Sequence, residues 1–60
     1  MKNYLLKSII GQATLEILSY QNSASKDEIL FYVSNNLSFF NIDNHQMQVI
    51  RNTLNRNNLN

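Results

Sequence analysis

The stretch SKDEILFYVSNNLSFF, residues 25–40, carries the clearest helix signal in this sequence. Ser25 and Glu28 have the spacing of a capping box, in which the serine hydroxyl accepts the Glu28 backbone N–H and the carboxylate accepts the Ser25 backbone N–H. Asp27 adds negative charge to the first turn, where the helix dipole favours it. Apolar residues then recur at helical spacing, at Ile29, Leu30, Val33, Leu37 and Phe40. The stretch therefore predicts one helix over residues 26–40, apolar on more than one side.

A second helix signal follows along the chain. Asp43 is a good N-cap with Gln46 in the capping-box position, and Ile42 and Met47 occupy the two positions of a hydrophobic staple. These residues predict a helix over residues 44–56. Its inward face would carry Met47, Ile50 and Leu54.

The segment before Ser25 predicts a third helix, over residues 3–20. Its inner seam alternates by four and three residues, as in a coiled coil, through Leu6, Ile10, Ala13, Ile17 and Tyr20. Further apolar residues fall outside that seam, at Leu5, Ile9, Leu15 and Leu18. They either widen the core face or form a second face for a partner chain. Gly11 costs about 1 kcal/mol relative to Ala in mid-helix, so it is either simply tolerated or it lets another helix approach closely.

No segment of the sequence shows the period-two alternation that is typical of a strand. The connections between the three expected helices are short and polar, as between neighbours in a bundle. The sequence therefore predicts an all-α fold, a three-helix antiparallel bundle, in a single domain over residues 1–60.

The small size of the chain favours self-association. A chain of 60 residues buries only about 60% of its unfolded surface, so such domains usually gain stability from disulfides, a metal or oligomerisation. The sequence has no Cys, and one His with four acidic residues offers no convincing metal site. We therefore expect a homodimer. Its interface, or that with another partner, would use the apolar excess at Leu5, Ile9, Leu15, Leu18, Phe39 and Phe40.

Composition also bears on the compartment. The lack of Cys fits a reducing environment, and Lys2, Lys7 and Gln12 interrupt any apolar signal-peptide pattern at the N-terminus. No stretch is long and apolar enough to span a membrane. We expect a cytoplasmic protein with no membrane partner.

No group of residues has the pattern of a catalytic site. His45 is expected to be exposed near the start of a helix, and helix capping fully explains Ser25. Asp27 and Glu28 are adjacent, so on a helix they point in different directions and cannot form a carboxylate pair. No glycine-rich loop could cradle a phosphate. We expect no enzymatic activity, no catalytic residue, and no bound cofactor or metal.

The basic residues near the C-terminus permit two interpretations. Arg51, Asn52, Asn55 and Arg56 form an outward strip opposite the inward face of the helix over residues 44–56. Arg and Asn are the side chains that read guanine and adenine edges in a major groove. The alternative is a solvated face that keeps a small protein soluble. The net charge of +1 does not by itself indicate nucleic acid.

The sequence resembles the YmgB/AriR family of small enterobacterial biofilm and acid-resistance regulators. The resemblance covers about residues 9–54, most of the chain, through three segments at consistent spacing. They are IIGQATLEILS (Ile9 to Ser19), SKDEIL (Ser25 to Leu30) and QVIRNTL (Gln48 to Leu54). The resemblance implies a compact helical homodimer that acts through protein partners as a connector to bacterial signalling pathways. Direct DNA contact is a further implication.

A second resemblance is to the helical half of a winged-helix domain. ATLEILSYQNSASKDEILFYV (Ala13 to Val33) looks like its first two helices, and HQMQVIRNTLNR (His45 to Arg56) looks like its recognition helix. A winged helix also needs a β-hairpin after its third helix, and this sequence ends at Asn60, so we rank this resemblance second.

The sequence thus predicts a non-enzymatic regulatory or connector protein in biofilm or stress signalling, working by protein–protein contacts as a homodimer with a regulatory protein partner. The alternative is a small helix-turn-helix-like transcriptional regulator that binds DNA through Arg51, Asn52, Asn55 and Arg56. A structural or antitoxin-like interaction protein is a third class.

Overall fold

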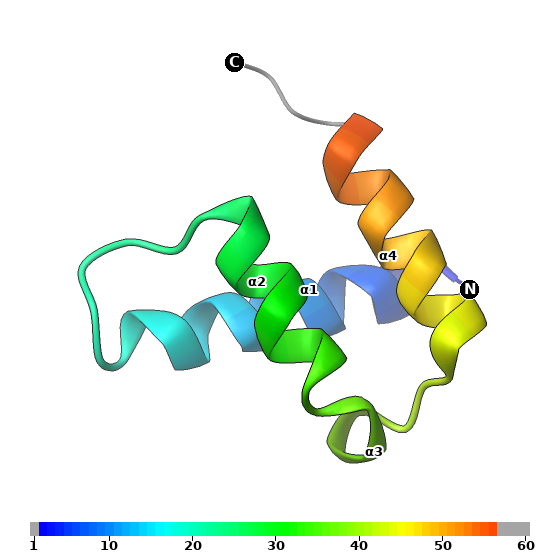
Figure 1. Ribbon diagram of the computed structural model, residues 1–60, viewed down its shortest axis with the longest axis horizontal. Helices are drawn as coiled ribbons and strands as arrows, with labels where there is room; N and C mark the ends of the chain where they lie inside the picture. The colour runs from blue at the N-terminus through cyan, green and yellow to red at the C-terminus, as the bar shows by residue number, and fades with distance from the viewer. Residues whose placement is uncertain (1, 57–60) are drawn as a thin grey trace.

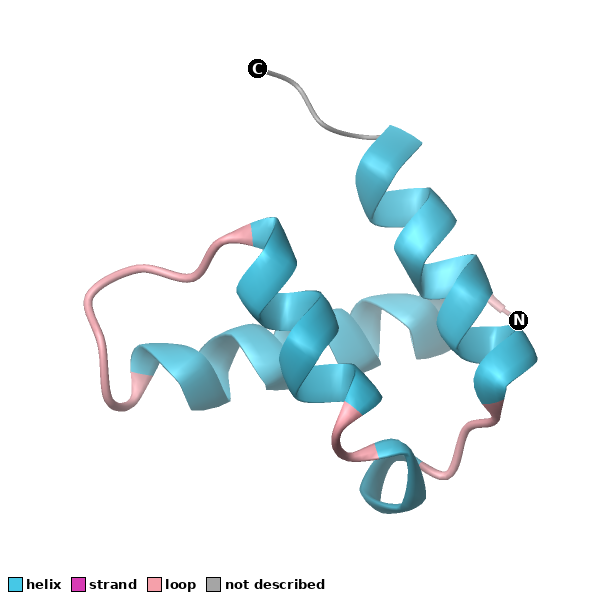
Figure 2. Cartoon of the chain, in the orientation of Figure 1, coloured by secondary structure: helices cyan, strands magenta, loops and turns pink. Residues whose placement is uncertain are grey.

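The structure is a computed structural model that describes residues 2–56. Those residues contain helices and no strand, so the predicted all-α fold is confirmed (Figure 2). The helices are α1 (Asn3–Leu18), α2 (Lys26–Ser34), α3 (Leu37–Phe40) and α4 (Asn44–Arg56). None of them is long and apolar enough to cross a membrane.

The three long helices form two crossed layers. In Figure 1, α2 and α4 lie side by side and run in opposite directions, and α1 crosses behind both of them. Residues 2–56 therefore show the predicted antiparallel arrangement only for the pair α2 and α4. α2 packs against α1, α3 and α4, so the stretch that gives the strongest helix signal also lies at the centre of the fold. The molecule is flat, with extents of 29 × 28 × 18 Å.

The core lies where α2 and α4 cover α1. It is built from apolar side chains of these three helices, namely Ile9, Ala13, Ile17, Ile29, Leu30, Val33, Met47 and Ile50. On α1 the buried residues recur every fourth position, which places them on one face of the helix. Ile9, which the sequence analysis placed with the interface residues, is only 4% exposed and belongs to this core. It widens the core face, as one of the two alternatives expects.

Both predicted capping boxes are present. At α2 the Glu28 N–H donates to Ser25 Oγ (3.1 Å), and the Ser25 N–H donates to Glu28 Oε1 (2.8 Å). At α4 the Gln46 N–H donates to Asp43 Oδ1 (2.8 Å), and the Asp43 N–H donates to Gln46 Oε1 (3.0 Å). Each pair satisfies backbone donors that the first helical turn leaves without a partner. α4 begins at the predicted Asn44 and is helical through Arg56, the last residue that the structure describes.

The single helix predicted over residues 26–40 is wrong, because the structure divides it into α2 and α3. The division has a local cause at Asn36. Its side-chain Nδ2 donates to the Tyr32 carbonyl (2.7 Å), which is the acceptor that the Asn36 N–H would use in a continuing helix. The Asn36 N–H bonds the Val33 carbonyl instead (3.0 Å), and its backbone leaves the helical region at φ −135° and ψ 35°. The side chain thus competes with the helix ladder and ends α2.

α3 ends in a turn that fixes the start of α4. Asn41 has the left-handed conformation, with φ 58° and ψ 47°, which Asn tolerates better than most residues. The Ile42 N–H reaches back to the Leu37 carbonyl and the Asn41 N–H to the Ser38 carbonyl, each at 3.1 Å. This is the hydrogen-bond pattern of a Schellman motif. Leu37 and Ile42 both pack against the core, so the turn is held by apolar contacts as well.

α1 ends two residues before its predicted limit at Tyr20. The Ser19 hydroxyl donates to the Glu16 carbonyl (2.6 Å), and the Tyr20 and Gln21 N–H groups both bond the Ile17 carbonyl at 3.1 Å. The chain therefore tightens into a turn after Leu18. Tyr20, which the sequence placed in the inner seam, is 65% exposed as a result.

Candidate interaction surfaces

The first candidate surface is the outer face of α1, which points away from the core. We define it by Tyr4, Ser8, Gly11, Leu15 and Leu18, whose spacing of four and three residues places them on one stripe of the helix. Tyr4 and Leu15 are each 71% exposed and Leu18 is 42% exposed. No element of residues 2–56 covers these apolar side chains, so α1 has one apolar stripe in the core and a second in solvent.

The middle of this outer face is open. A Cβ placed on Gly11 would meet no atom within 4 Å outside its own helix. A shallow depression surrounds the glycine, lined by Lys7, Ser8, Gly11, Gln12, Leu15 and Glu16. Close packing inside the chain therefore does not explain Gly11, and both alternatives from the sequence, simple tolerance and the approach of another chain, still stand.

The remaining predicted interface residues lie in two places, Leu5 on α1 and the pair Phe39 and Phe40 on α3. Leu5 is 40% exposed on the flank of α1, and Phe39 is 65% exposed on α3. Phe40 is half-buried against the core. Its ring makes edge contacts with Tyr32 (centroids 6.1 Å apart) and Phe39 (5.1 Å). The six residues predicted as one interface thus divide among the core, α1 and α3.

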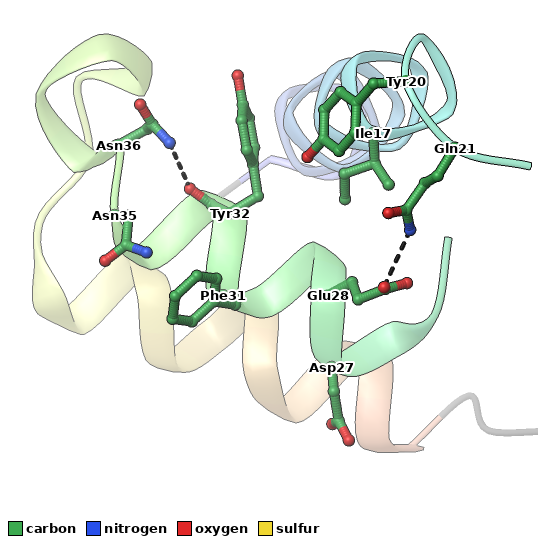
Figure 3. A pocket seen from close by; sticks show the side chains of 9 residues that line it. All are labelled: Ile17, Tyr20, Gln21, Asp27, Glu28, Phe31, Tyr32, Asn35 and Asn36. Carbon is green, nitrogen blue, oxygen red and sulfur yellow. Dashed lines mark hydrogen bonds between the residues drawn. The ribbon is translucent and has the colours of Figure 1, made fainter. Parts of the chain in front are cut away.

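The second candidate surface is a groove between the end of α1 and one side of α2, which we call the α1–α2 groove. Figure 3 shows its lining side chains, and its volume is about 510 Å³. Ile17 lies at its base, nearly fully buried, whereas Phe31 is 70% exposed. The full lining comprises Ile17, Tyr20, Gln21, Asp27, Glu28, Phe31, Tyr32, Asn35 and Asn36.

The lining of this groove includes two carboxylates, which leave α2 in different directions (Figure 3). Glu28 is held in place, because its Oε2 accepts from Gln21 Nε2 (2.9 Å) while its Oε1 accepts from the Ser25 N–H. The hydrogen bond from the Ser25 backbone, followed by that from Gln21, lowers the pKa of Glu28 below its ordinary value of 4.5. Glu28 therefore stays ionised at neutral pH. Asp27, next to it, is exposed and makes no hydrogen bond or ion pair within residues 2–56.

The predicted basic strip lies on α4 as the sequence indicates. Asn52, Asn55 and Arg56 are exposed and Arg51 is half-buried, and the Asn52 Oδ1 accepts from Gln48 Nε2 at 3.1 Å. Arg56 also shares a surface depression with Lys7 of α1. The strip is therefore accessible, with one of its amides already engaged within the helix.

The structure also shows where the side chains weighed for catalysis or metal binding lie. No three His, Cys, Asp or Glu side chains of residues 2–56 lie close enough to hold a metal ion. His45 is exposed in the first turn of α4, and the Ser25 hydroxyl serves the helix cap. The accessible features of residues 2–56 are apolar and charged surfaces.

Sequence reasoning missed three exposed aromatic residues that belong to these surfaces. Tyr4 begins the outer face of α1, and Tyr20 and Phe31 form walls of the α1–α2 groove. A signal was present for Phe31, which lies two positions from both Ile29 and Val33 and so faces away from them on a helix. Tyr20 offered no such signal, because its exposure follows from the turn after Leu18.

The chain was compared with family models, curated proteins and solved structures, and none of the three comparisons gave a match.

Proposed function

We propose that this protein is a non-enzymatic regulatory protein that works as a homodimer and acts through protein–protein contacts. The observation that carries the proposal is the outer face of α1, where Tyr4, Leu15 and Leu18 remain exposed on a helix whose opposite face is already buried. A helix that is apolar on two faces is typical of one packed between two partners. Within residues 2–56 only one of those partners is present.

The outer face is complementary to itself when two copies of α1 pair in opposite directions about Gly11. Tyr4 and Leu18 lie at equal distances from Gly11 along the chain, so each would face the other in the second copy. An isologous twofold dimer requires a self-complementary patch of this kind. Gly11 at the centre would let the two helix backbones approach closely.

If the protein is a dimer, its stability against unfolding should increase with protein concentration. We expect light scattering to find a dimer at tens of micromolar, and the melting temperature to rise with concentration. Leu15→Glu should produce a monomer, because it places two charges in the apolar interface. A monomer at all these concentrations, with a melt independent of concentration, would reject the proposed dimer.

Gly11→Ala gives a test in which dimer and monomer respond in opposite directions. In an isolated exposed helix the substitution should stabilise the monomer by about 1 kcal/mol. If the helices meet at Gly11, the added methyl groups should weaken the dimer. A matched control is Gln12→Ala, next to Gly11 but at the edge of the stripe. Gly11→Ala dimers that are as tight as the wild type would place the interface elsewhere.

The resemblance to the YmgB/AriR family supports a role in biofilm or stress signalling, as a connector that contacts a regulatory protein. The test is deletion of the gene in its host, with measurement of biofilm mass and survival in acid. Complementation with the wild type should restore both, and complementation with Leu15→Glu should not. Full rescue by the monomeric variant would show that the regulatory role does not require the dimer.

DNA binding through α4 is the second candidate function. The observation that favours it is that α4 and residues 2–15 contain four basic residues and no acidic one. Two of those cations, Lys7 and Arg56, line the same depression. Arg51, Asn52, Asn55 and Arg56 would then face the duplex. We rank it second because the formal net charge is only +1 and phosphate contacts dominate affinity for DNA.

A further inference from the structure

We propose that the α1–α2 groove binds a basic, amphipathic peptide segment of another protein, in which an apolar side chain adjoins one or more Lys or Arg side chains. This inference goes beyond the proposed function. It concerns a different surface from the outer face of α1, and the two can be tested separately.

The apolar part of the groove can take an anchoring side chain. Ile17 forms the base at 2% exposure, and Tyr20 and Phe31 stand at the walls with 65% and 70% of their surface in solvent. Tyr32, half-buried, closes the groove on a third side (Figure 3). Such partly covered aromatic side chains are the usual anchors of peptide and protein interfaces, because a partner removes their remaining surface from water.

The polar part of the groove selects for positive charge. Asp27 and Glu28 are the charged groups of the lining, and no lysine, arginine or histidine is among the lining residues. Gln21 and Ser25 fix the Glu28 carboxylate by hydrogen bonds of 2.9 and 2.8 Å. An incoming cation therefore meets a carboxylate whose geometry is already set. Asp27 beside it has no partner within residues 2–56 that a cation would have to displace.

The same charges argue against other occupants. Phosphate groups of nucleic acids and of anionic lipid surfaces bind to cationic sites, and the carboxylates here would repel them. A second copy of this chain is also a poor fit. The depression in which two of its cations, Lys7 and Arg56, gather is itself concave. A short segment that enters the groove satisfies both the shape and the charge.

The test is a selection of random peptides displayed on phage against the full-length protein, followed by binding of the enriched peptides in solution. We expect the enriched peptides to combine Lys or Arg with an apolar or aromatic residue. Phe31→Ser and Asp27→Lys should each weaken binding of the best such peptide by about tenfold or more. Phe39→Ser is the matched control, because Phe39 is an equally exposed aromatic on α3, and it should bind as the wild type does.

Each other outcome counts against the proposal. Enriched peptides that are acidic, or that bind Phe31→Ser as tightly as the wild type, would place the peptide site elsewhere. A selection that enriches no peptide would overturn the assignment of a peptide partner. Loss of the dimer in Phe31→Ser, with helix content by circular dichroism unchanged, would show that a second copy occupies the groove. Loss of the dimer in Leu15→Glu, in contrast, concerns only the outer face of α1.

Discussion

The hydroxyl of Ser25 accepts the Glu28 N–H at 3.1 Å and so satisfies one of the free backbone donors at the start of α2. We predict that Ser25→Ala lowers the free energy of unfolding by about 0.5–2 kcal/mol. Urea unfolding at fixed protein concentration measures the change. Ser38→Ala is the control, because Ser38 is exposed and caps no helix. Equal losses in the two variants would show that the cap contributes nothing.

The carboxylate of Glu28 makes the contribution of the same cap to folding stability depend on pH. Its pKa is lowered mainly by the hydrogen bond from the Ser25 backbone, so ionised Glu28 favours the folded state. This contribution is fully present above the unfolded pKa and is lost as the pH falls through the lower folded pKa. We predict that the wild type exceeds Glu28→Gln in stability at neutral pH, and that the difference shrinks below the ordinary value of 4.5. Unfolding curves that keep a constant separation over this range would refute the linkage.

Capping boxes could be predicted from the sequence because both partners lie within one helical turn. The pairs Ser25 with Glu28 and Asp43 with Gln46 need no knowledge of the rest of the fold. The environment of Phe31 could be predicted only in part. Helical spacing turns it away from the core, but the groove beside it exists only because the end of α1 packs near α2. A surface built from two helices depends on the tertiary arrangement.

Among the helices, the division between α2 and α3 shows that apolar periodicity does not predict where a helix ends. Apolar spacing continues through Leu37 and Phe40, so the pattern predicts a helix that does not stop. The structure stops it through one side-chain amide, that of Asn36, which takes the Tyr32 carbonyl. Asn residues often end helices in this way, but whether a given Asn does so is decided by small differences in free energy. The pattern alone therefore could not locate the break.

For α1 the difficulty lies in predicting which face is buried, because apolar residues occur on several sides of this helix. Leu5, Ile9, Leu15 and Leu18 all lie outside the expected seam, and only Ile9 is buried. Choosing among them requires knowing where α2 and α4 cross the helix. The sequence therefore correctly indicates that α1 has an apolar excess, and it does not say which side that excess faces.

Asn41 offers a test of how α3 ends. Its φ of 58° costs a residue with a Cβ about 1–2 kcal/mol, and glycine has no such cost. We predict that Asn41→Ala destabilises the protein by about 1 kcal/mol relative to Asn41→Gly, as measured from urea midpoints. Asn35 is the control position, because its φ of −88° suits any residue. If Gly is favoured over Ala equally at Asn35 and Asn41, the left-handed turn is not the cause.

For the molecule as a whole, charge is distributed as unevenly as apolar surface. The four acidic residues and Lys26 all lie within residues 16–43, and the other four basic residues lie outside that range. The α1–α2 groove carries Asp27 and Glu28, and the depression beside α4 carries Lys7 and Arg56. The groove and this depression therefore present charges of opposite sign. In the proposed arrangement the apolar outer face of α1 would bind a second copy of the chain, and the separate acidic groove would bind a basic peptide.

The basic side of the molecule gives the last prediction. If α4 read DNA, Arg51 and Arg56 would supply phosphate contacts, and affinity would fall with a log–log salt slope of about −0.9 per phosphate neutralised. The formal net charge is +1 per chain and only twice that in a dimer, which is a weak source of attraction. We therefore predict that the protein binds duplex DNA only weakly near physiological salt. We also predict that the double variant Arg51→Ala, Arg56→Ala keeps the proposed dimer and most of the proposed regulatory activity.

The experiment is a titration of labelled host promoter fragments with the wild type, the double-arginine variant and Lys26→Gln, at low and physiological salt. Lys26→Gln is the control because it removes a positive charge outside α4. Weak binding that is lost with salt in all three proteins would confirm non-specific attraction. Nanomolar binding to one fragment at physiological salt, retained in Lys26→Gln and lost in the double variant, would put DNA recognition by α4 ahead of protein–protein contacts. Such specificity would have to come from base contacts by Arg51, Asn52, Asn55 and Arg56, because contacts to phosphates carry no sequence information.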